Sequence, residues 1–425
     1  MYINTSRVFT YKKPLLITFI ILIFGMAVYL RLDFLMSVNH HVSHDTLNYD
    51  IMVRQLLEKG IYAYKDSAPN AQVTPGYPLF MAAVYTLVDY HKHDPLPYIR
   101  YIQLIISLVT LWMIYKVSRK VTGQTASLIV LLVCSVYPPF IWSNGAVLTE
   151  TLATFFLMLY IYVQLLVFEK KTNISALLGG ALMGLLVLTR SEFLILILPV
   201  YAFHFFWKKD KKLTLRLLLF TCLGTGIVLS PWVIRNAVTL HEVVIASTQV
   251  NPFQAGTYPD KNYEDGLVDR HGKTQMEVAK ERLRIGFTEH TWQFTKWYTV
   301  GKLKYIYSKM YFGSGHSPLY PVLPSPLGST LHLALVYFCP VALVAHIRRW
   351  RQSITLLTLI LIIMTLTRLA FVPEYRYNYT AMPIIIIMDA ITGIAILRWV
   401  WQKVTKSGTS GPQEGVANYA ECTRK

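Results

Sequence analysis

Charged side chains are scarce in this sequence, since Asp, Glu, Lys and Arg make up only 15% of its 425 residues. A typical soluble domain carries about 25% of them. Hydrophobic residues reach 54%, and the mean hydropathy is +0.40. This composition excludes a single soluble domain and indicates a chain that lies largely in a lipid bilayer.

Acidic residues are few as well: 23 stand against 41 basic ones, and the net charge is +18. An excess of this kind can indicate nucleic-acid binding, but that function needs a basic patch or stripe. Here the cations form short clusters between apolar runs, for example at residues 116–120, 208–212 and 348–351. Because cationic loops stay in the cytoplasm, the clusters predict cytoplasmic loops and no nucleic-acid partner.

Cysteine is rare too. Cys134, Cys222 and Cys339 lie in apolar runs and Cys422 lies near the end of the chain, so we expect no disulfide framework in the loops outside the cell. The first apolar run, residues 14–30, lacks the small-residue cleavage site of a signal peptide. It predicts a retained membrane anchor.

Apolar runs of about 20 residues, the length that crosses a bilayer, recur along the chain. We expect ten crossing helices, at residues 14–33, 98–116, 124–142, 147–168, 174–189, 192–207, 213–233, 328–346, 353–371 and 380–399. If the run 77–88 also crossed, every later cationic cluster would move outside, so we expect a juxtamembrane or re-entrant helix there. The predicted fold is an all-α polytopic membrane protein with both termini in the cytoplasm.

This threading divides the chain into four parts. Residues 1–236 form a transmembrane module whose first outer loop spans 34–97. Residues 237–327 form a second outer segment with an amphipathic helix near 280–312. Residues 328–405 supply the C-terminal transmembrane helices, and 406–425, rich in Gly, Ser and Thr, is expected to be a disordered cytoplasmic tail.

Chemically active side chains crowd into the first outer loop, in SVNHHVSHDTLNYD at residues 37–50. Asp45 and Tyr49 are four residues apart and would share a helix face. The imidazoles of His40, His41 and His44, together with the carboxylate of Asp45, could hold zinc or manganese. Adjacent His40 and His41 would diverge on a helix, so we expect no metal and no other cofactor. Asp45 could also serve only as a helix N-cap.

An ordered series of short motifs carries a family resemblance. After Asp45 and Tyr49 come PGYP at 75–78, LTET at 148–151, LTRSEFLILILP at 188–199, SPWVIRN at 230–236 and EYRYNYTAMP at 374–383. In this order the chain resembles bacterial GT-C glycosyltransferases, the dolichyl-phosphate-mannose protein mannosyltransferase-like enzymes, whose relatives include the lipid A aminoarabinose transferase. The resemblance covers almost the whole chain and implies a GT-C-like bundle with outer juxtamembrane helices.

The resemblance also implies roles for single residues. Asp45 matches the catalytic aspartate of the first loop, a general base that activates the acceptor. Glu150 matches a second acidic residue of the active site, although a carboxylate at a helix start can simply complement the helix dipole. Substrate-binding roles are implied for Tyr49, Tyr77, Arg190, Arg235, Arg376 and Tyr377. Arg376 is the expected phosphate cation, while interfacial arginines can also merely snorkel.

The implied reaction is an inverting transfer of a sugar from a polyprenyl-phosphate donor. The acceptor would be a cell-envelope glycan, lipid or protein, and the active site would face outward from the plasma membrane. Two alternatives stay open, a polyprenyl-linked glycan ligase or polymerase and a lipid flippase or transporter. Asp389, near the middle of the last span, is expected to be an internal hydrogen-bonding residue outside the chemistry.

Overall fold

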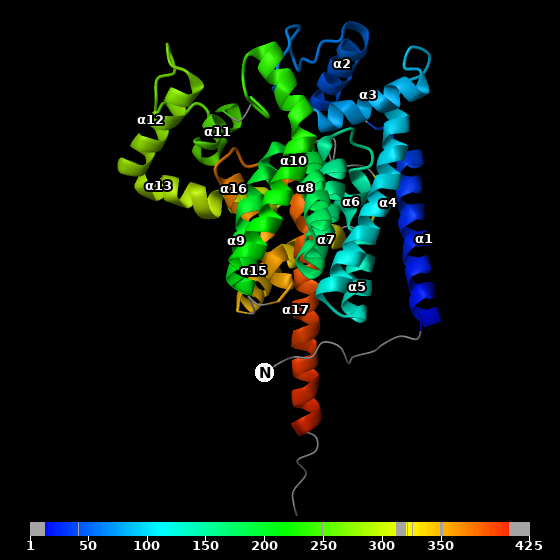
Figure 1. The fold of residues 1–425 in the computed structure, drawn as a ribbon. Helices are drawn as coiled ribbons and strands as arrows, with labels where there is room; N and C mark the ends of the chain where they lie inside the picture. Colours follow the sequence, from blue (N-terminus) through cyan, green and yellow to red (C-terminus); the bar gives the residue numbers. More distant parts are fainter. Residues whose placement is uncertain are drawn as a thin grey trace, which may run out of the picture.

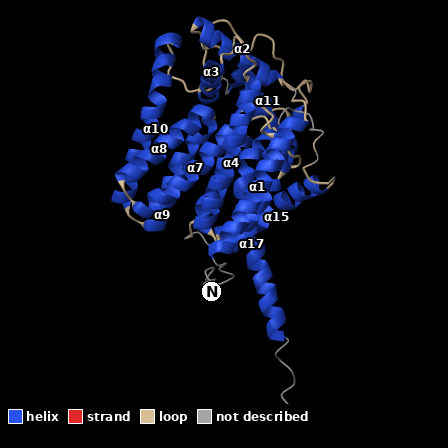
Figure 2. Cartoon of the chain, turned by 90° about the vertical axis from the view of Figure 1, so that its right-hand side faces the viewer, coloured by secondary structure: helices blue, strands red, loops and turns tan. Residues whose placement is uncertain are grey.

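The computed structural model of the chain describes residues 13–40, 42–247, 250–311, 320, 322–324, 326–348 and 352–407. Within these residues every regular element is a helix, and no strand is drawn in Figure 2. The predicted all-α class is therefore confirmed. The predicted disordered tail lies almost entirely outside the described residues.

Seven helical stretches of the described chain are long and apolar enough to cross a membrane. They contain α1 (Lys13–Ser37), α4 (Leu96–Val121), α7 (Thr149–Lys170), α9 (Ile197–Lys208) with the 3-10 turn Ser191–Leu196 before it, α10 (Lys211–Leu240), α15 (Leu327–Ile347) and α17 (Asn378–Ser407). Shorter apolar helices are α3 (Gly76–Val88), α5 (Gln124–Val136), α8 (Asn173–Thr189) and α16 (Ile354–Leu369). Each of the ten predicted spans overlaps one of these helices, and the chain is a multi-pass membrane protein.

One predicted span is wrong in its extent. Residues 124–142 do not form one helix, because α5 ends at Val136 and a separate short helix, α6 (Pro138–Trp142), follows it. Tyr137 between them is extended, with φ −65° and ψ 117°. A residue that precedes proline is pushed out of the α region, and here two prolines follow, so the break is dictated by the sequence PP at 138–139.

Close contact between α8 and α10 holds the middle of the bundle. A Cβ added at Gly180 would lie 2.0 Å from the Thr221 carbonyl oxygen, and one at Gly224 would lie 2.1 Å from that of Leu177. Thr225 donates from its hydroxyl to the Gly180 carbonyl oxygen at 3.0 Å. Small residues that let two backbones approach, together with hydroxyl–carbonyl bonds, stabilise helix pairs in lipid.

The helices outside the bundle gather at one end of it. Figure 1 shows α2 (His44–Lys59), α3, α11 (Val250–Gly256) and α12 (Gln275–Thr288) at that end, while α17 extends from the opposite end. α3 lies beside α2 and leads into α4 at this end, in agreement with the juxtamembrane position predicted for residues 77–88.

The amphipathic helix predicted near 280–312 is wrong as a single element. The chain forms α12, then α13 (Thr291–Lys296), a π-helical turn at Trp297–Gly301 and α14 (Lys302–Tyr307). α12 and α13 fold against each other at Gly286, where an added Cβ would lie 2.2 Å from the Phe294 ring. Trp297 is buried and donates from Nε1 to the Gly256 carbonyl oxygen at 2.9 Å, whereas Trp292 is 78% exposed.

Candidate active site

Helix α2 begins at a serine cap. The Ser43 hydroxyl oxygen accepts a hydrogen bond from the Thr46 backbone N–H at 3.2 Å, which is the role of an N-cap side chain. Asp45 is therefore in the first turn and is not the cap, and its carboxylate is free for other partners. The Thr46 hydroxyl donates to the Val147 carbonyl oxygen at 3.2 Å, so α2 is fixed directly to the loop that precedes Glu150.

Asp45 forms an ion pair with Arg376, from the other end of the sequence. Arg376 Nη1 lies 3.0 Å from Asp45 Oδ2, and each side chain is 39% exposed. The second carboxylate oxygen, Oδ1, accepts from the Tyr64 hydroxyl at 3.4 Å. Burial, and then the charge of Asp45, raises the pKa of Tyr64 to about 12, so this phenol keeps its proton at neutral pH. Asp45 is thus held from two sides and still reached by solvent.

Glu150 opens α7 and is almost fully buried, with 2% of its surface exposed. Its Oε1 lies 3.3 Å from Arg190 Nη1, and its Oε2 has no hydrogen-bond partner among the described residues. Arg190 is the C-cap of α8 and also lies 3.5 Å from Glu192 Oε2. A buried carboxylate with one open oxygen is costly without a further donor, so Glu150 Oε2 is a candidate acceptor for a further hydrogen bond.

Tyr377 lies between the two ion pairs. Its ring centroid is 5.4 Å from the guanidinium carbon of Arg190 and 5.9 Å from that of Arg376. Arg368 lies at 5.8 Å from the same ring and donates to the Tyr377 carbonyl oxygen at 2.6 Å. Guanidinium groups over an aromatic face are attracted by its quadrupole. Tyr377 therefore brings the Asp45–Arg376 and Glu150–Arg190 pairs into one cluster.

Sequence reasoning missed three members of this cluster: Tyr64, Glu192 and Arg368. Glu192 accepts from Arg368 Nη2 at 3.0 Å as well as from Arg190, so one carboxylate joins the buried Arg368 to the partly exposed Arg190. Glu192 stands inside LTRSEFLILILP, where a charged pair in an apolar run is a signal for function. Arg368 and Tyr64 have no comparable local signal, because only the tertiary fold brings them to the site.

Tyr77 supports the site without touching the ion pairs. It is fully buried, and its hydroxyl donates to Gln103 Oε1 at 2.8 Å. Gln103 Nε2 in turn donates to the Ala146 carbonyl oxygen at 2.9 Å, in the loop before Glu150. Tyr49 is buried next to it, its ring centroid 5.6 Å from that of Tyr77 and 5.4 Å from that of Tyr64. Both tyrosines act here as packing that connects α2 and α3 to the Glu150 loop.

The PGYP turn fits tightly against the end of α8. A Cβ added at Gly76 would lie 2.7 Å from the Leu188 carbonyl oxygen, so the close approach requires glycine. The Thr74 hydroxyl donates to the Thr189 carbonyl oxygen at 3.0 Å. These contacts fix the turn beside Arg190, which caps the same helix.

Arg235 lies apart from the carboxylate cluster. It donates to the carbonyl oxygens of Asn70 and Tyr62, each at 3.0 Å, and to Asn236 Oδ1 at 2.9 Å. Its guanidinium also stacks over the Tyr62 and Trp232 rings. In this position Arg235 holds the loop between α2 and α3, and a substrate contact from it remains a prediction.

The described histidines of residues 37–50, His40 and His44, belong to no candidate metal site. His40 Nε2 lies 3.2 Å from the Leu35 carbonyl oxygen, and its ring packs edge-on against Phe34. Burial and the nearby charge of Arg100 lower the pKa of His40. Within the described ranges no three His, Cys, Asp or Glu side chains form a group that could hold a metal, and His41 lies outside those ranges.

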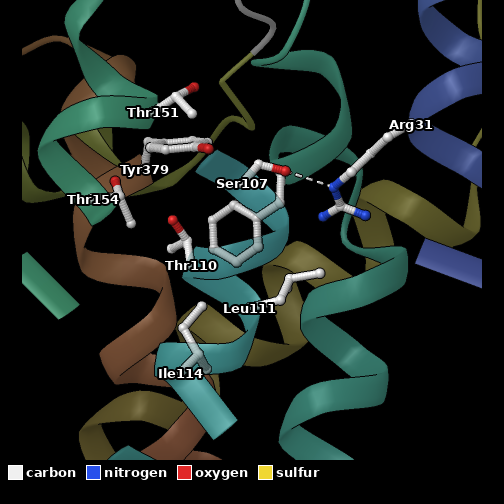
Figure 3. A pocket seen from close by; sticks show the side chains of 9 residues that line it. Arg31, Ser107, Thr110, Leu111, Ile114, Thr151, Thr154 and Tyr379 are labelled. Atoms are coloured by element: carbon white, nitrogen blue, oxygen red, sulfur yellow. Dashed lines mark hydrogen bonds between the residues drawn. The ribbon is translucent and has the colours of Figure 1, made fainter. Parts of the chain in front are cut away.

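A small cavity lies within the helices (Figure 3). Its lining includes Arg31 of α1, Ser107 and Thr110 of α4, Thr151 of α7 and Tyr379 of α17. Arg31 is fully buried and donates from Nε to the Ser107 hydroxyl at 2.7 Å. The volume of about 10 Å³ suits a single water molecule, so a sugar does not fit there. Asp389 is deeper in α17, buried, and neither oxygen has a partner in the described part of the chain.

Comparison with known proteins agrees with this architecture. Residues 71–234 match the family model described as dolichyl-phosphate-mannose-protein mannosyltransferase. No curated protein matches the chain.

Solved structures of two glycosyltransferases share the fold. Archaeal oligosaccharyltransferase AglB from Archaeoglobus fulgidus, in complex with an inhibitory peptide and a dolichol-phosphate, matches with a TM-score of 0.59 at 13% identity, over 96% of this chain and 53% of AglB. ArnT from Cupriavidus metallidurans, bound to undecaprenyl phosphate, matches with a TM-score of 0.56 at 13% identity, over 93% of this chain and 63% of ArnT. The chain thus spans about half the length of AglB.

The match within residues 71–234 includes the PGYP turn, Tyr77, Glu150 and Arg190. The structural likeness extends the agreement to the rest of the bundle. The resemblance seen in the sequence is confirmed: this chain has the fold of the GT-C membrane glycosyltransferases and carries, over residues 71–234, the sequence pattern of the dolichyl-phosphate-mannose-protein mannosyltransferase family.

Proposed function

We propose that the protein transfers a sugar from a polyprenyl-phosphate donor to an acceptor outside the cytoplasm, with inversion at the anomeric carbon. The observation that carries the proposal is the half-exposed carboxylate of Asp45 in contact with the half-exposed guanidinium of Arg376. The reaction needs a base for the acceptor and a cation for the leaving phosphate. These two groups stand side by side at the end of the bundle where the outer helices gather.

Asp45 is the proposed general base. It takes the proton from an acceptor hydroxyl or amine while the acceptor atom forms a bond to the anomeric carbon. The bond from that carbon to the phosphate oxygen breaks, and the electron pair leaves with the polyprenyl phosphate. Attack opposite to the leaving group inverts the anomeric centre.

Arg376 is the proposed partner of the phosphate. Charge grows on the leaving oxygen as the bond breaks, and a guanidinium in a partly dry site stabilises that charge. Arg376 Nη1 also donates to Asp45 Oδ2 at 3.0 Å. Arrival of the phosphate would draw the guanidinium away and free the base, so the donor is proposed to bind before the acceptor is activated.

Glu150 and Arg190 form the second part of the proposed site. The open Oε2 of Glu150 can accept a hydrogen bond from a sugar or acceptor hydroxyl, and the Arg190 contact holds Oε1 in place. Tyr377 separates the two pairs and offers a ring face for the sugar. Tyr49 and Tyr77 act behind the contact surface.

The proposed active site faces outward from the plasma membrane, and both termini face the cytoplasm. The cationic clusters between the helices support this orientation. A cell-envelope glycan, lipid or protein is the proposed acceptor class, because these are the molecules accessible on that side. The structures of AglB and ArnT contain dolichol-phosphate and undecaprenyl phosphate respectively, which supports a polyprenyl carrier for the donor.

Transfer can be tested with purified protein in nanodiscs. A donor with a radiolabelled sugar on undecaprenyl phosphate is mixed with envelope extract, and label is followed in acceptor and lipid fractions. The proposal expects label to move covalently to the acceptor with release of free undecaprenyl phosphate. Lipid that crosses the bilayer of sealed vesicles with its sugar still attached, and no transfer, would show a flippase instead.

A further inference from the structure

We infer that Lys261, in the second outer segment, is a positioning residue that fixes Arg376 through Glu374. Lys261 Nζ lies 2.5 Å from Glu374 Oε1, with 17% and 30% of the two side chains exposed. Glu374 is two residues before Arg376, and its carbonyl oxygen accepts from the Tyr377 N–H at 3.0 Å, which closes the 3-10 turn that carries Arg376. The inference rests on the proposed function, in which Arg376 binds the donor phosphate.

The backbone conformation at Lys261 indicates that the surrounding structure enforces its contact with Glu374. Asp260 has φ 52° and ψ 19°, and Lys261 has φ 59°. Two consecutive non-glycine residues in the left-handed region are unfavourable and persist only where the surroundings require them. Here they direct the Lys261 amine to Glu374, and the Nζ also lies 4.3 Å from the Tyr305 ring centroid.

Other contacts of the same outer segment surround the residues next to Arg376. The Val372 N–H donates to the Pro252 carbonyl oxygen at 2.8 Å. Gly256 packs so closely on Phe371 that an added Cβ would lie 2.5 Å from its carbonyl carbon. Asn378 Nδ2 donates to the Ile306 carbonyl oxygen at 3.0 Å. Residues before and after Arg376 are thus held by residues 250–311, while the Arg376 side chain itself turns to Asp45.

The chemical consequence is a constraint on the reaction geometry. Hydrogen bonds from a guanidinium to a phosphate depend on placement, and a misplacement of about 1 Å can lower a rate about a hundredfold. Lys261 does not touch the reacting groups. It acts by holding the segment that presents Arg376, so its loss is expected to affect the donor step.

A control exists within the same segment. Lys273 Nζ lies 2.5 Å from Glu281 Oε2, and the side chains are 35% and 31% exposed. This pair has the same length and chemistry, but it joins the turn before α12 to α12 itself. Lys273→Met therefore removes an equivalent ion pair without touching residues 369–378.

The experiment compares Lys261→Met, Lys261→Arg and Lys273→Met in nanodiscs by two readouts. Hydrogen exchange of residues 371–378 reports the segment directly: Lys261→Met is expected to speed it at least about tenfold, and Lys273→Met to leave it unchanged. Steady-state kinetics report the consequence: Lys261→Met is expected to lower donor kcat/KM at least about tenfold with acceptor KM unchanged. Lys261→Arg should restore most of both.

The two readouts separate the inference from the proposed function. If Lys261→Met changes exchange and kinetics no more than Lys273→Met does, the positioning role is overturned, and transfer by the wild type still stands. If the wild type transfers no sugar, the proposed function fails, and the exchange readout alone decides whether Lys261 holds the Arg376 segment. The exchanged pair Lys261→Glu with Glu374→Lys should recover slow exchange, which a loss of overall folding would not allow.

Discussion

Arg376 makes an observed contact to Asp45, and the proposed chemistry adds a contact to the donor phosphate. We expect Arg376→Ala to lower donor kcat/KM about a hundredfold, because one stabilising donor is lost from the transition state. Acceptor KM should stay nearly constant. Lysine should rescue only in part, since a point charge cannot form the bidentate contact. Arg54→Ala is the control, because Arg54 pairs with Asp50 at 3.0 Å on the far part of α2. An increase in acceptor KM alone would mean that Arg376 contacts the acceptor.

Lys302 offers a pH test of the outer segment. It is fully buried and donates to the Leu369 carbonyl oxygen at 2.7 Å, and burial lowers the pKa of Lys302 to about 7. The pKa of a lysine in an unfolded chain is about 10.4. Between these values the unfolded chain binds a proton that the folded chain releases, so stability should rise with pH from about 7 to about 10.

Thermal unfolding in detergent across this range measures the effect of Lys302. The wild-type Tm is expected to rise relative to that of Lys302→Met, which lacks the titrating amine. Lys273→Met keeps Lys302 and should follow the wild type. A constant difference between wild type and Lys302→Met over the whole range would mean that Lys302 titrates as an exposed lysine does.

At single residues, the sequence predicted Asp45, Glu150, Arg190 and Arg376, and the structure brings all four into one cluster around Tyr377. Glu150 and Arg190 stand at the ends of predicted spans, and Arg376 lies just before the last predicted span, where the local pattern limits the position of each. Arg235 also stands at such an end, yet it turns to the loop carbonyls of Asn70 and Tyr62. The rotation of the helix about its axis decides whether such a side chain joins the cluster or turns to the loop. A single sequence does not determine that rotation closely enough to predict the direction of one side chain.

Helices were predictable where apolar runs are uninterrupted, and the errors occur at breaks. The division at Tyr137 follows from Pro138 and Pro139, a local signal that the length of the apolar run concealed. The turn between α12 and α13 has no such signal. It depends on Phe294 packing against Gly286, a contact that exists only after the segment has folded on itself.

The tight contact between the PGYP turn and α8 predicts that a larger residue at Gly76 lowers the stability of the protein. Gly76→Ala would place a Cβ 2.7 Å from the Leu188 carbonyl oxygen, and overpacking of this kind costs about 1–3 kcal/mol. Gly226→Ala is the matched change, because nothing lies within 4 Å of its Cβ position, and alanine favours a helix by up to about 1 kcal/mol. Thermal unfolding in detergent should therefore show a lower Tm for Gly76→Ala only. Equal Tm values for Gly76→Ala and Gly226→Ala would contradict the close approach of Gly76 to the Leu188 carbonyl oxygen.

For the whole molecule, the orientation in the membrane is the property on which the proposal depends. Single cysteines at Ala68, exposed in the loop after α2, and at Lys170, exposed at the opposite end of α7, can be introduced after the native cysteines are replaced by serine. Ala68→Cys is expected to react with an impermeant maleimide in sealed right-side-out vesicles, and Lys170→Cys only after the vesicles are opened. The reverse pattern would place the Asp45 cluster in the cytoplasm and exclude an extracytoplasmic acceptor.

The most direct measurement of the central claim is sugar transfer by Asp45→Asn beside Asp50→Asn. Both aspartates are in α2, and Asp50 is held by Arg54 and by the Tyr85 hydroxyl at 2.6 Å, so the two nearly isosteric changes disturb the same helix. If Asp45 is the general base, Asp45→Asn should lose at least about a hundredfold in transfer of radiolabelled sugar from undecaprenyl phosphate, while Asp50→Asn stays close to the wild type. Near-normal turnover by Asp45→Asn would contradict the account.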